Sequence, residues 1–410
     1  MANVSSSNGL EKRPKLRFPG FDEPYRSAQL GDIAALVNRT DPKSNAPIMM
    51  LSAGNGFIMQ SEKYSRDNAG QSLKKYILLK QGELAYNHGA SKAKQFGCCY
   101  ELTEPEARIP YVYHCFKINN HEYTPFIAMA LNNAKMDKQL KRLVSSSVRM
   151  DGLLNISFED YMSVTIHLPS PSEQKRIADF LQKIDERIAA QEELLASLKK
   201  YKRGLISEIL NQKIRITHED EKWEEVSLSA VADGFEYGMN AAATIFDGVH
   251  KYIRITDIDD DSHTYIDSAP VSPAGVLEGK YRVRENDILF ARTGASVGKS
   301  YLYQASDGDM YFAGFLIRIH VIDGVDSGYV FLNTLTEEYN RWVALESTRS
   351  GQPGINAEQY RRYRFKLPPL ETQKQISAIA QKIDAQIKRE SQCLRLLQKQ
   401  KDGFLQQLFI

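Results

Sequence analysis

Cysteine is scarce in this chain of 410 residues, and none of its cysteines forms a C-x-x-C pair. The four are Cys98, Cys99, Cys115 and Cys393. Adjacent cysteines without further ligands are poor chelators, so the spacing predicts neither a disulfide framework nor a metal site. Reduced, buried thiols are typical of cytoplasmic proteins, and we expect a cytoplasmic location.

Long apolar runs are also lacking. No stretch approaches the roughly 20 apolar residues of a membrane-spanning helix, so we expect no membrane contact. The polar, Ser-rich segment Met1–Gly9 lacks the charged-then-apolar pattern of a secretory signal. We therefore expect residues 1–24 to form an N-terminal tail.

Catalytic signatures are a third absence. The chain has no Asn/Asp-Pro-Pro-aromatic run, which gates the flipped base in adenine methyltransferases, and no G-x-G-x-x-G, H-E-x-x-H or G-x-S-x-G motif. Gly294–Ser300 has three residues between its glycines, where a phosphate-binding loop needs four. We therefore expect no catalytic residue, cofactor or metal ligand in this chain.

The charge is unevenly distributed along the chain, although the formal net charge is only +2. Residues 1–167 carry 21 Lys and Arg against 16 Asp and Glu, a net charge of +5. Residues 213–366 carry 17 against 24, a net charge of −7. Because an acidic surface repels phosphate, a nucleic-acid contact in the second segment needs a local basic face.

What the chain does contain is a long internal repeat. A shift of 199 residues aligns the sequence from Leu168 with that from Leu367 and matches 15 residues without a gap. Tyr25–Ala34 likewise aligns with Trp223–Ala232 at an offset of 198. A period this long indicates a tandem duplication of a globular domain and a helix. The predicted boundaries are domain 25–167, central helix 168–212, domain 213–366 and C-terminal helix 367–410.

Both repeated segments are predicted to be long helices that pair with each other. Each follows a proline-containing stop, and no further proline interrupts it. Apolar residues recur at alternating spacings of four and three, which is the narrow seam of a coiled coil. The predicted seam residues are Ile177, Ile184, Ile188, Gln191, Leu195 and Leu198, and then Ile376, Ile383, Ile387, Glu390, Leu394 and Leu397.

Polar residues interrupt the seam at matching places, Gln191 with Glu390 and Lys202 with Lys401. Such residues weaken a helix pair but fix its register. If the helices are antiparallel and overlap along their whole length, the numbers of facing residues add to 581 and Gln191 faces Glu390. We hypothesise that this polar pair sets the register.

This arrangement resembles the specificity subunits of type I restriction–modification systems over nearly the whole chain. The most specific parts of the resemblance are the helix openings Leu168–Gln174 and Leu367–Gln373, together with Lys15–Phe21. The second opening departs from the family at Thr372, where a glutamate is usual.

The resemblance implies an α/β (α+β) fold with two target recognition domains and two long helices that form an antiparallel coiled coil, related by a pseudo-twofold repeat. It implies a non-catalytic subunit that recognises a bipartite target in double-stranded DNA, with the half-site spacing set by the coiled coil. It also implies partners: two modification subunits, which bind S-adenosylmethionine and methylate adenine, and restriction (motor) subunits. The alternative is a coiled-coil adaptor whose domains bind proteins instead of DNA.

Polar loop residues supply the candidate DNA contacts of the second domain. Glycines permit close approach of the backbone, Arg and Lys neutralise phosphates or read guanine, and hydroxyl groups donate hydrogen bonds. A solvated surface turn or strand face is the alternative for each residue. The predicted contacts are Arg292, Thr293, Ser296, Lys299, Ser300, Arg361 and Arg362.

The first domain has a counterpart in the loop that follows the predicted strand at Leu84–Asn87. Asn87 could read adenine through a bidentate pair, and neighbouring lysines could hold the backbone. Without a placed carboxylate, His88 is expected to be a contact residue rather than an acid or base. The predicted contacts are Lys63, Tyr64, Arg66, Asn87, His88, Ser91, Lys92 and Lys94.

Overall fold

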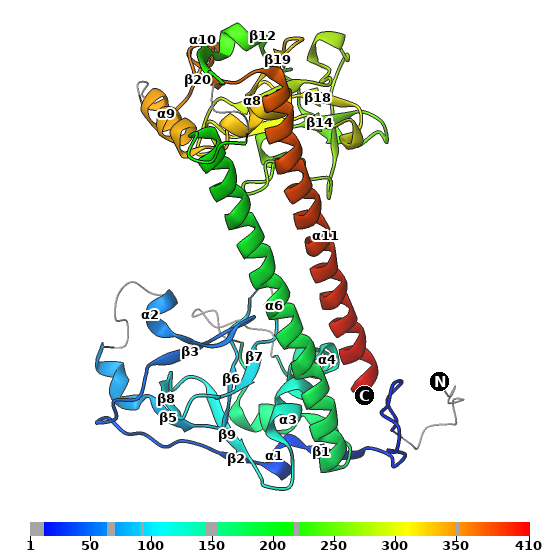
Figure 1. The fold of residues 1–410 in the computed structure, drawn as a ribbon. Coiled ribbons are helices and arrows are strands. Elements are labelled where there is room, and N and C mark those ends of the chain that lie inside the picture. Colours follow the sequence, from blue (N-terminus) through cyan, green and yellow to red (C-terminus); the bar gives the residue numbers. More distant parts are fainter. Residues whose placement is uncertain (1–11, 64–69, 92–93, 145–153, 217–220, 349–352) are drawn as a thin grey trace. The chain divides into compact units, whose positions relative to one another are not determined.

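The computed structural model describes residues 12–63, 70–91, 94–144, 154–216, 221–348 and 353–410. The chain divides into two compact units. Unit 1 consists of Met1–Glu192 with Cys393–Ile410, and unit 2 consists of Glu193–Gln392. Each unit therefore contains one globular domain and a part of each long helix (Figure 1).

The domain of unit 1 is built from short strands and helices and is followed by the first long helix. Its elements are β1 (Arg26–Gln29), α1 (Leu30–Ile33), β2 (Ala34–Leu36), β3 (Met49–Ser52), β4 (Gly56–Met59), α2 (Gln60–Lys63), β5 (Ile77–Lys80), β6 (Leu84–Asn87), β7 (Cys98–Glu101), β8 (Glu106–Ile109), β9 (His114–Ile118), α3 (Thr124–Leu131), α4 (Ala134–Leu143), α5 (Phe158–Met162), β10 (Thr165–Leu168) and α6 (Pro171–Leu210).

The second half of the chain repeats this plan with its own set of elements. They are β11 (Glu224–Ser227), α7 (Leu228–Val231), β12 (Ala232–Tyr237), β13 (Ala243–Ile245), β14 (Lys251–Ile253), β15 (Val271–Pro273), β16 (Asp287–Ala291), β17 (Ser300–Leu302), β18 (Met310–Phe312), β19 (Leu316–Val321), α8 (Ser327–Asn333), α9 (Glu337–Ser347), α10 (Ala357–Arg361), β20 (Arg364–Leu367) and α11 (Leu370–Leu408).

Each domain is built around a four-stranded antiparallel sheet with the same strand order. The order is β2-β9-β6-β7 in unit 1 and β12-β19-β16-β17 in unit 2. A separate antiparallel pair joins the first and last strands of each domain, β1 with β10 and β11 with β20. The same connectivity occurs twice, which confirms the duplication that the sequence repeat predicts.

Outside the shared sheet the two domains differ. In unit 1 the strand before the central strand, β5, pairs with β8 in antiparallel fashion. In unit 2 a parallel pair, β14 with β18, lies beside the sheet instead, and β13 pairs with β15. The duplication therefore preserves the central sheet and varies the peripheral strands.

The middle strands β6 and β16 begin at equivalent tight turns. The residue two positions before Leu84 is Gly82, with φ of 80°, and the residue before Asp287 is Asn286, with φ of 67°. Glycine and asparagine are the residues that adopt this left-handed conformation most readily. These turns direct the following apolar residues into the interior, where β16 is buried along its whole length.

A carboxylate follows each of these turns and is buried by the sheet. Glu83 accepts two hydrogen bonds from Arg39, of 3.0 and 2.8 Å. Burial raises the pKa of Glu83, but the hydrogen bonds from Arg39 and from the Lys80 N–H, together with the nearby positive charges of Arg39 and Lys117, bring the pKa below its usual value. Asp287 is 2.8 Å from His320 Nδ1, and here burial dominates and raises the pKa. The buried carboxylate at this position therefore has a different partner in each domain, Arg39 in unit 1 and His320 in unit 2.

Residues 12–24 pack on unit 1, so the predicted N-terminal tail is wrong for this segment. The Arg17 guanidinium donates two hydrogen bonds to the Glu173 carboxylate, of 2.9 and 2.8 Å. The Phe18 ring packs edge-on against Phe180 at a centroid distance of 5.5 Å. Arg17 and Phe18 therefore contact residues of α6. The polar composition of this segment does not indicate these contacts, because the partners lie far along the chain.

A buried glutamine holds the start of each long helix to its own domain. Gln174 and Gln373 are 0% and 2% exposed. The Gln174 Oε1 atom accepts the backbone N–H of Tyr123, at the start of α3, and Gln373 Oε1 accepts that of Asp326, at the start of α8, both at 2.9 Å. Each Nε2 donates to the proline carbonyl five residues earlier, at 3.0 and 2.7 Å. One side chain thus joins the helix, the Leu-Pro stop and the domain.

The residue before each glutamine uses a different partner in the two copies. Glu173 is fully buried and binds Arg17. Thr372 is 3% exposed, and its hydroxyl donates to Glu221 Oε1 at 2.6 Å. With threonine at position 372, the start of α11 is still bonded to the chain before β11. The acidic group of this bond is now Glu221 instead of a residue of the helix.

Helices α6 and α11 pack together through the predicted stripe (Figure 1). The predicted seam residues are buried or half-buried, whereas most residues that flank them are exposed. In unit 1 Phe180 packs edge-on against Phe404 with ring centroids 5.0 Å apart. In unit 2 Ile209 and Ile376 belong to one core. The apolar stripe of each helix is therefore covered by the other helix and by its own domain.

Two symmetric ion pairs link the helices. In unit 2 Lys202 Nζ lies 2.6 Å from Asp384 Oδ1, and in unit 1 Lys401 pairs with Asp185. The offset of 199 that relates the sequence copies also relates these two pairs. The lysines that interrupt the apolar seam therefore reach acidic residues across the helix pair.

The register given by these ion pairs differs from that of full overlap. In both pairs the residue numbers add to 586, whereas full overlap requires 581. The first turn of each helix, at Gln174 and Gln373, is buried and bonded to its domain. The pairing of Gln191 with Glu390 involves both units and stays a prediction.

We predict that replacement of Gln373 by alanine lowers the free energy of unfolding by about 1–3 kcal/mol, because the amide of Asp326 and the Pro368 carbonyl lose a buried partner. Urea unfolding followed by circular dichroism measures the change. The exposed Gln381 on the same helix provides the matched control, since Gln381→Ala removes no buried bond. Equal stability of the two variants would contradict the anchoring role.

Candidate DNA-recognition surfaces

The two central sheets present equivalent ends. In unit 2 this end lies where β12 and β16 finish and β19 begins, and we call it sheet end 2 (Tyr237, Arg292, Phe315). In unit 1 it lies where β2 and β6 finish and β9 begins, and we call it sheet end 1 (Leu36, His88, Tyr111). The shared topology makes these two ends the natural candidates for equivalent recognition surfaces.

At sheet end 2, Arg292 lies between two exposed aromatic rings. The centre of its guanidinium is 5.1 Å from the Tyr237 ring centroid and 5.9 Å from that of Phe315. Tyr237 is 44% exposed and Phe315 is 60% exposed. A cation between two aromatic rings gains attraction from both ring faces, and the rings restrict its rotamers.

The backbone around Arg292 is held on both sides. Its N–H donates to the Phe315 carbonyl at 3.1 Å, and its carbonyl accepts the Ile355 N–H at 2.9 Å. Its Nε donates to the Gly314 carbonyl at 2.9 Å. The guanidinium is thus bonded to the sheet end through Nε, and the backbone that carries it is held by two hydrogen bonds.

Gly238 permits this arrangement by lacking a side chain. A Cβ atom at this position would lie 2.2 Å from the Ala313 carbonyl oxygen, which is far inside van der Waals contact. The turn between β18 and β19, which carries Phe315, can therefore approach the end of β12 only when glycine follows Tyr237.

Lys299 and Ser300, predicted as DNA contacts, face the interior instead. Lys299 Nζ donates to the Ile258 carbonyl at 2.9 Å and pairs with Asp260, and its side chain is 10% exposed. Ser300 is fully buried, with its hydroxyl 2.7 Å from that of Thr334. The prediction is wrong for these two residues because the start of β17 folds inward against the 255–260 segment and α8.

The other predicted residues of unit 2 lie on the surface. Thr293 and Ser296 are half-buried in the loop after β16. The Arg361 guanidinium lies 4.3 Å from the Phe235 ring centroid, and its Nε is 3.2 Å from Glu358. Arg362 is exposed. These four residues stay candidate contacts, with Arg362 the more accessible of the two arginines.

Sheet end 1 exposes apolar side chains and a lysine that the sequence pattern did not single out. Leu36 and Tyr111 are 54% and 49% exposed. Lys75 Nζ lies 5.7 Å from the Tyr111 ring centroid, which places a cation on an aromatic face as at sheet end 2. The available signal was the Lys74–Lys75 pair before an apolar strand, and we add both lysines to the candidates.

His88 and Asn87, predicted as contacts in unit 1, are engaged within the domain. His88 is 6% exposed, and its ring packs 4.9 Å from His114 and 6.3 Å from Tyr86. The prediction is wrong for His88, because the sheet end closes over its ring. The Asn87 Oδ1 atom accepts the Gly89 N–H at 2.9 Å in a local turn, and Asn87 stays a candidate contact.

Lys94 is likewise bonded within the domain. Its Nζ donates to the Asn132 carbonyl at 2.6 Å, at the C-terminal end of α3, where a cation compensates unpaired carbonyls. Ser91 is exposed and bonds with the Lys94 backbone, and Lys63 is exposed at the end of α2. Three predicted contacts lie outside the described residues: Tyr64, Arg66 and Lys92.

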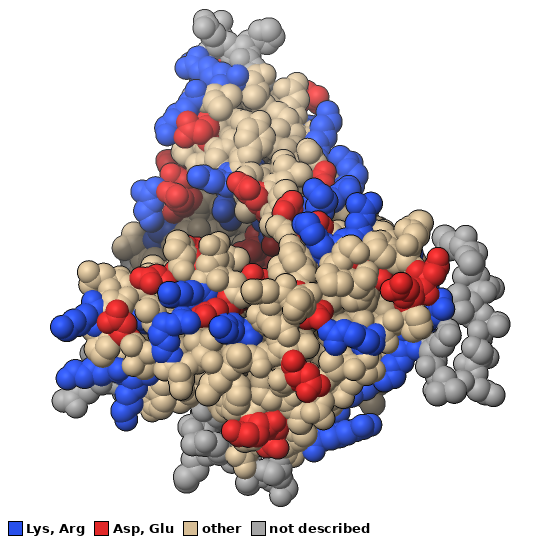
Figure 2. Space-filling view, turned by 90° about the horizontal axis from the view of Figure 1, so that it is seen from below, with Lys and Arg blue, Asp and Glu red and all other residues tan. Residues whose placement is uncertain are grey.

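Basic side chains are interspersed with acidic ones over the face shown in Figure 2. Mixed charge of this kind weakens the long-range attraction of phosphate. This face is therefore not uniformly basic, and a DNA contact on it needs individually placed cations.

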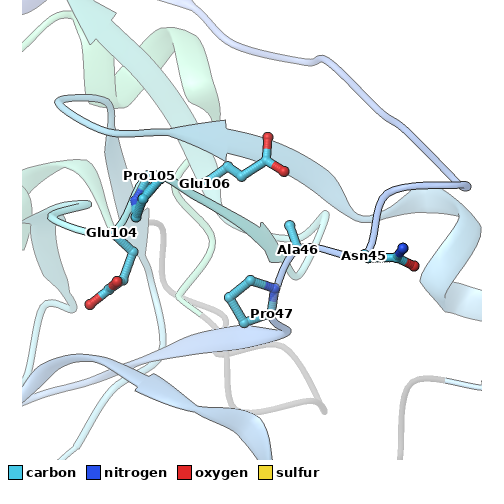
Figure 3. A pocket seen from close by; sticks show the side chains of 6 residues that line it. All are labelled: Asn45, Ala46, Pro47, Glu104, Pro105 and Glu106. Atoms are coloured by element: carbon cyan, nitrogen blue, oxygen red, sulfur yellow. The ribbon is translucent and has the colours of Figure 1, made fainter.

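A surface depression in unit 1 lacks the features of a ligand or metal site. It has a volume of about 350 Å³ and is lined by Asn45, Ala46, Pro47, Glu104, Pro105 and Glu106. Figure 3 shows that the Glu104 and Glu106 carboxylates point away from each other and do not converge on a common point. Among the described residues no group of His, Cys, Asp and Glu could hold a metal ion, and no helix of that part is long and apolar enough to cross a membrane.

We predict that acidification destabilises unit 1 through His114. Burial lowers the pKa of His114, and its hydrogen bond to the Ile156 carbonyl only partly opposes this. The unfolded chain therefore takes up a proton more readily than the folded one. The stability from the neutral ring is fully present above about pH 6.5 and is lost as the pH falls through the folded pKa.

The measurement is urea unfolding at about pH 7.5 and about pH 5.5, above and below the ordinary pKa of histidine. His114→Gln should lose less stability on acidification than the unmodified chain does. The exposed His121 is the control, and His121→Gln should leave the pH dependence unchanged. An unaltered pH dependence in His114→Gln would show that this ring does not contribute.

Comparison with known proteins points to one family. The profile described as "Type I restriction modification DNA specificity domain" matches twice, at residues 25–200 and 220–398. A Methanocaldococcus jannaschii protein assigned as the MjaX type I restriction enzyme specificity subunit is 25% identical over 209 residues. That match covers 48% of this chain and 48% of the relative, so the chain aligns with about half of the relative's length.

Two solved structures share the fold. A chain from a study of complex assembly and conformational transition of the type I R-M system superimposes with a TM-score of 0.56 at 16% identity, covering 95% of this chain and 98% of that one. The type I restriction–modification S subunit from M. genitalium gives a TM-score of 0.55 at 14% identity, with 97% and 99% covered. Because the family profile matches both halves of the chain, the protein belongs to the family of type I restriction–modification DNA specificity subunits.

Proposed function

We propose that the two domains read the two halves of a gapped sequence in double-stranded DNA, one half-site each. The observation that carries this proposal is the duplicated domain with its repeated central sheet, and in each copy a cation lies near an exposed aromatic ring. Exposed aromatic and cationic groups on a rigid scaffold are the usual means of contacting base edges and phosphates. The two copies differ in sequence, so the two half-sites differ as well.

The paired helices α6 and α11 act in this proposal as the spacer between the half-sites. An α-helix rises about 1.5 Å per residue, so the 40 residues of α6 span about 60 Å. The ion pairs Lys202–Asp384 and Lys401–Asp185 support a defined register, which a spacer of constant length requires.

The chain contributes recognition in this proposal and leaves the chemistry to its partners. No adenine-methyltransferase motif occurs in its sequence. Two modification subunits that bind S-adenosylmethionine would methylate adenine at the recognised sites, and restriction (motor) subunits would complete a cytoplasmic complex. One solved structure that this chain resembles comes from a study of complex assembly of the type I R-M system.

The two domains should differ in how strongly they use phosphate contacts. The net charge is +5 for residues 1–167 and −7 for residues 213–366. Neutralised phosphates make binding salt-dependent, so the first domain is expected to supply most of the salt-dependent affinity.

The direct test is methylome sequencing of cells that express this chain with its modification subunits. The proposal expects a single gapped motif, modified on both strands and absent without this chain. Methylation that is independent of the chain, or a continuous ungapped motif, would overturn it. The coiled-coil adaptor would be favoured instead if this chain captured a specific protein and showed no sequence preference on random DNA.

We predict that a longer helix pair lengthens the spacer between the half-sites. One heptad is inserted between Glu192 and Glu193 and another between Gln392 and Cys393, so that both helices extend together. Seven residues add about 10 Å, or about three base pairs of B-DNA. These base pairs also rotate the second half-site by about 100°, so methylation should be slower as well.

The preferred spacer is measured by methylome sequencing of the variant complex. The length-preserving double variant Glu192→Ala and Gln392→Ala, at two exposed positions, is the control and should keep the original spacer. An unchanged spacer in the heptad variant would exclude the helix pair as the determinant of spacing.

A further inference from the structure

The outward edge of Arg292 has no partner within the described ranges of the chain. Its Nε is bonded to the Gly314 carbonyl, whereas no hydrogen bond or ion pair of the two terminal Nη groups occurs among those residues. The guanidinium lies close to two aromatic rings, and its backbone is bonded to Phe315 and Ile355. The two Nη groups of this planar guanidinium therefore remain as a pair of parallel donors for a ligand.

Two parallel donors match one base pattern in the major groove. Guanine presents two acceptors, O6 and N7, whereas adenine presents an acceptor beside a donor. An arginine held in a fixed plane can therefore donate both hydrogen bonds to guanine. With adenine in the same place, one of its donors faces the N6 amino group, which is itself a donor. Because the rings of Tyr237 and Phe315 already restrict the side chain, little further ordering is needed on binding.

The surroundings of Arg292 favour a base edge over a phosphate. Phe315 and Tyr237 present large exposed apolar surfaces beside the guanidinium. Such groups fit base edges and thymine methyl groups, whereas phosphate oxygens remain hydrated. The domain also carries a net charge of −7 over residues 213–366, which disfavours contacts whose only basis is attraction to phosphate.

The equivalent position in unit 1 is occupied differently. His88 follows β6 as Arg292 follows β16, and the His88 carbonyl accepts the Leu154 N–H at 2.9 Å, as the Arg292 carbonyl accepts that of Ile355. His88 is nevertheless buried. A base contact from this strand end is therefore a property of unit 2 alone.

We propose that Arg292 is a specificity-determining residue that reads a guanine in the half-site of unit 2, with its guanidinium oriented by Tyr237 and Phe315. This inference rests on the proposed function, since it presupposes that unit 2 reads a half-site. It assigns one base and one side chain and makes no claim on the half-site of unit 1.

The test uses the complex of the full chain with its modification subunits, bound to duplexes that carry the methylome motif. Each position of the unit 2 half-site is replaced in turn. The unmodified complex should prefer guanine at one position by about tenfold to a hundredfold. Arg292→Ala should remove this preference at that position and leave the half-site of unit 1 unaffected.

Two further variants separate base reading from phosphate binding and from misfolding. Arg292→Lys keeps the positive charge but loses the two parallel donors of the guanidinium. The preference for guanine should therefore fall, while the salt dependence of binding stays the same. Arg362→Ala removes an exposed arginine of the same unit and should weaken binding on all sequences alike. Phe315→Ala removes one exposed ring without touching the guanidinium and should lower the guanine preference partially.

Three results would overturn the inference. One is an Arg292→Ala complex that keeps the guanine preference. Another is a uniform loss of affinity accompanied by a reduced salt slope, which marks a phosphate contact. The third is an Arg292→Ala chain whose thermal unfolding shows a folding defect while Phe315→Ala leaves the preference intact. Failure of the proposed function is distinct, because the unmodified complex would then show no gapped motif.

Discussion

The buried glutamine at the start of each long helix is the contact on which the positions of both domains depend. Gln174 and Gln373 each tie a long helix to the residue before a domain helix and to the proline after the preceding strand. A buried amide leaves no polar atom unpaired only when all of these groups are in place. The helix direction is therefore set by the domain to which the helix belongs, before any contact with the other helix.

The register of the helix pair is displaced from full overlap, and two lysines in the seam reach acidic residues on the other helix. A polar seam residue is unfavourable unless a partner meets it, so these lysines disfavour other registers. The ion pairs are partly exposed and add little stability themselves. Their effect is on alignment.

The two domains show how one scaffold supports two surfaces. The turn, the buried carboxylate and the sheet order are shared, while the partner of the carboxylate changes from Arg39 to His320. The residue that follows the central strand changes from a buried His88 to an Arg292 between aromatic rings. Substitution at the sheet end alters which groups reach the surface without disturbing the core, because the core residues lie further along the strands.

The sequence by itself determined the duplication, the two long helices and the family, because repeats, heptad spacing and short motifs are linear features. It also singled out Arg292 as a candidate contact, because this residue follows an apolar strand. Only the tertiary structure showed that Lys299, Ser300 and His88 face inward, since their partners lie dozens of residues away in the chain. The same holds for the register, because the acidic partners of the seam lysines lie on the other long helix.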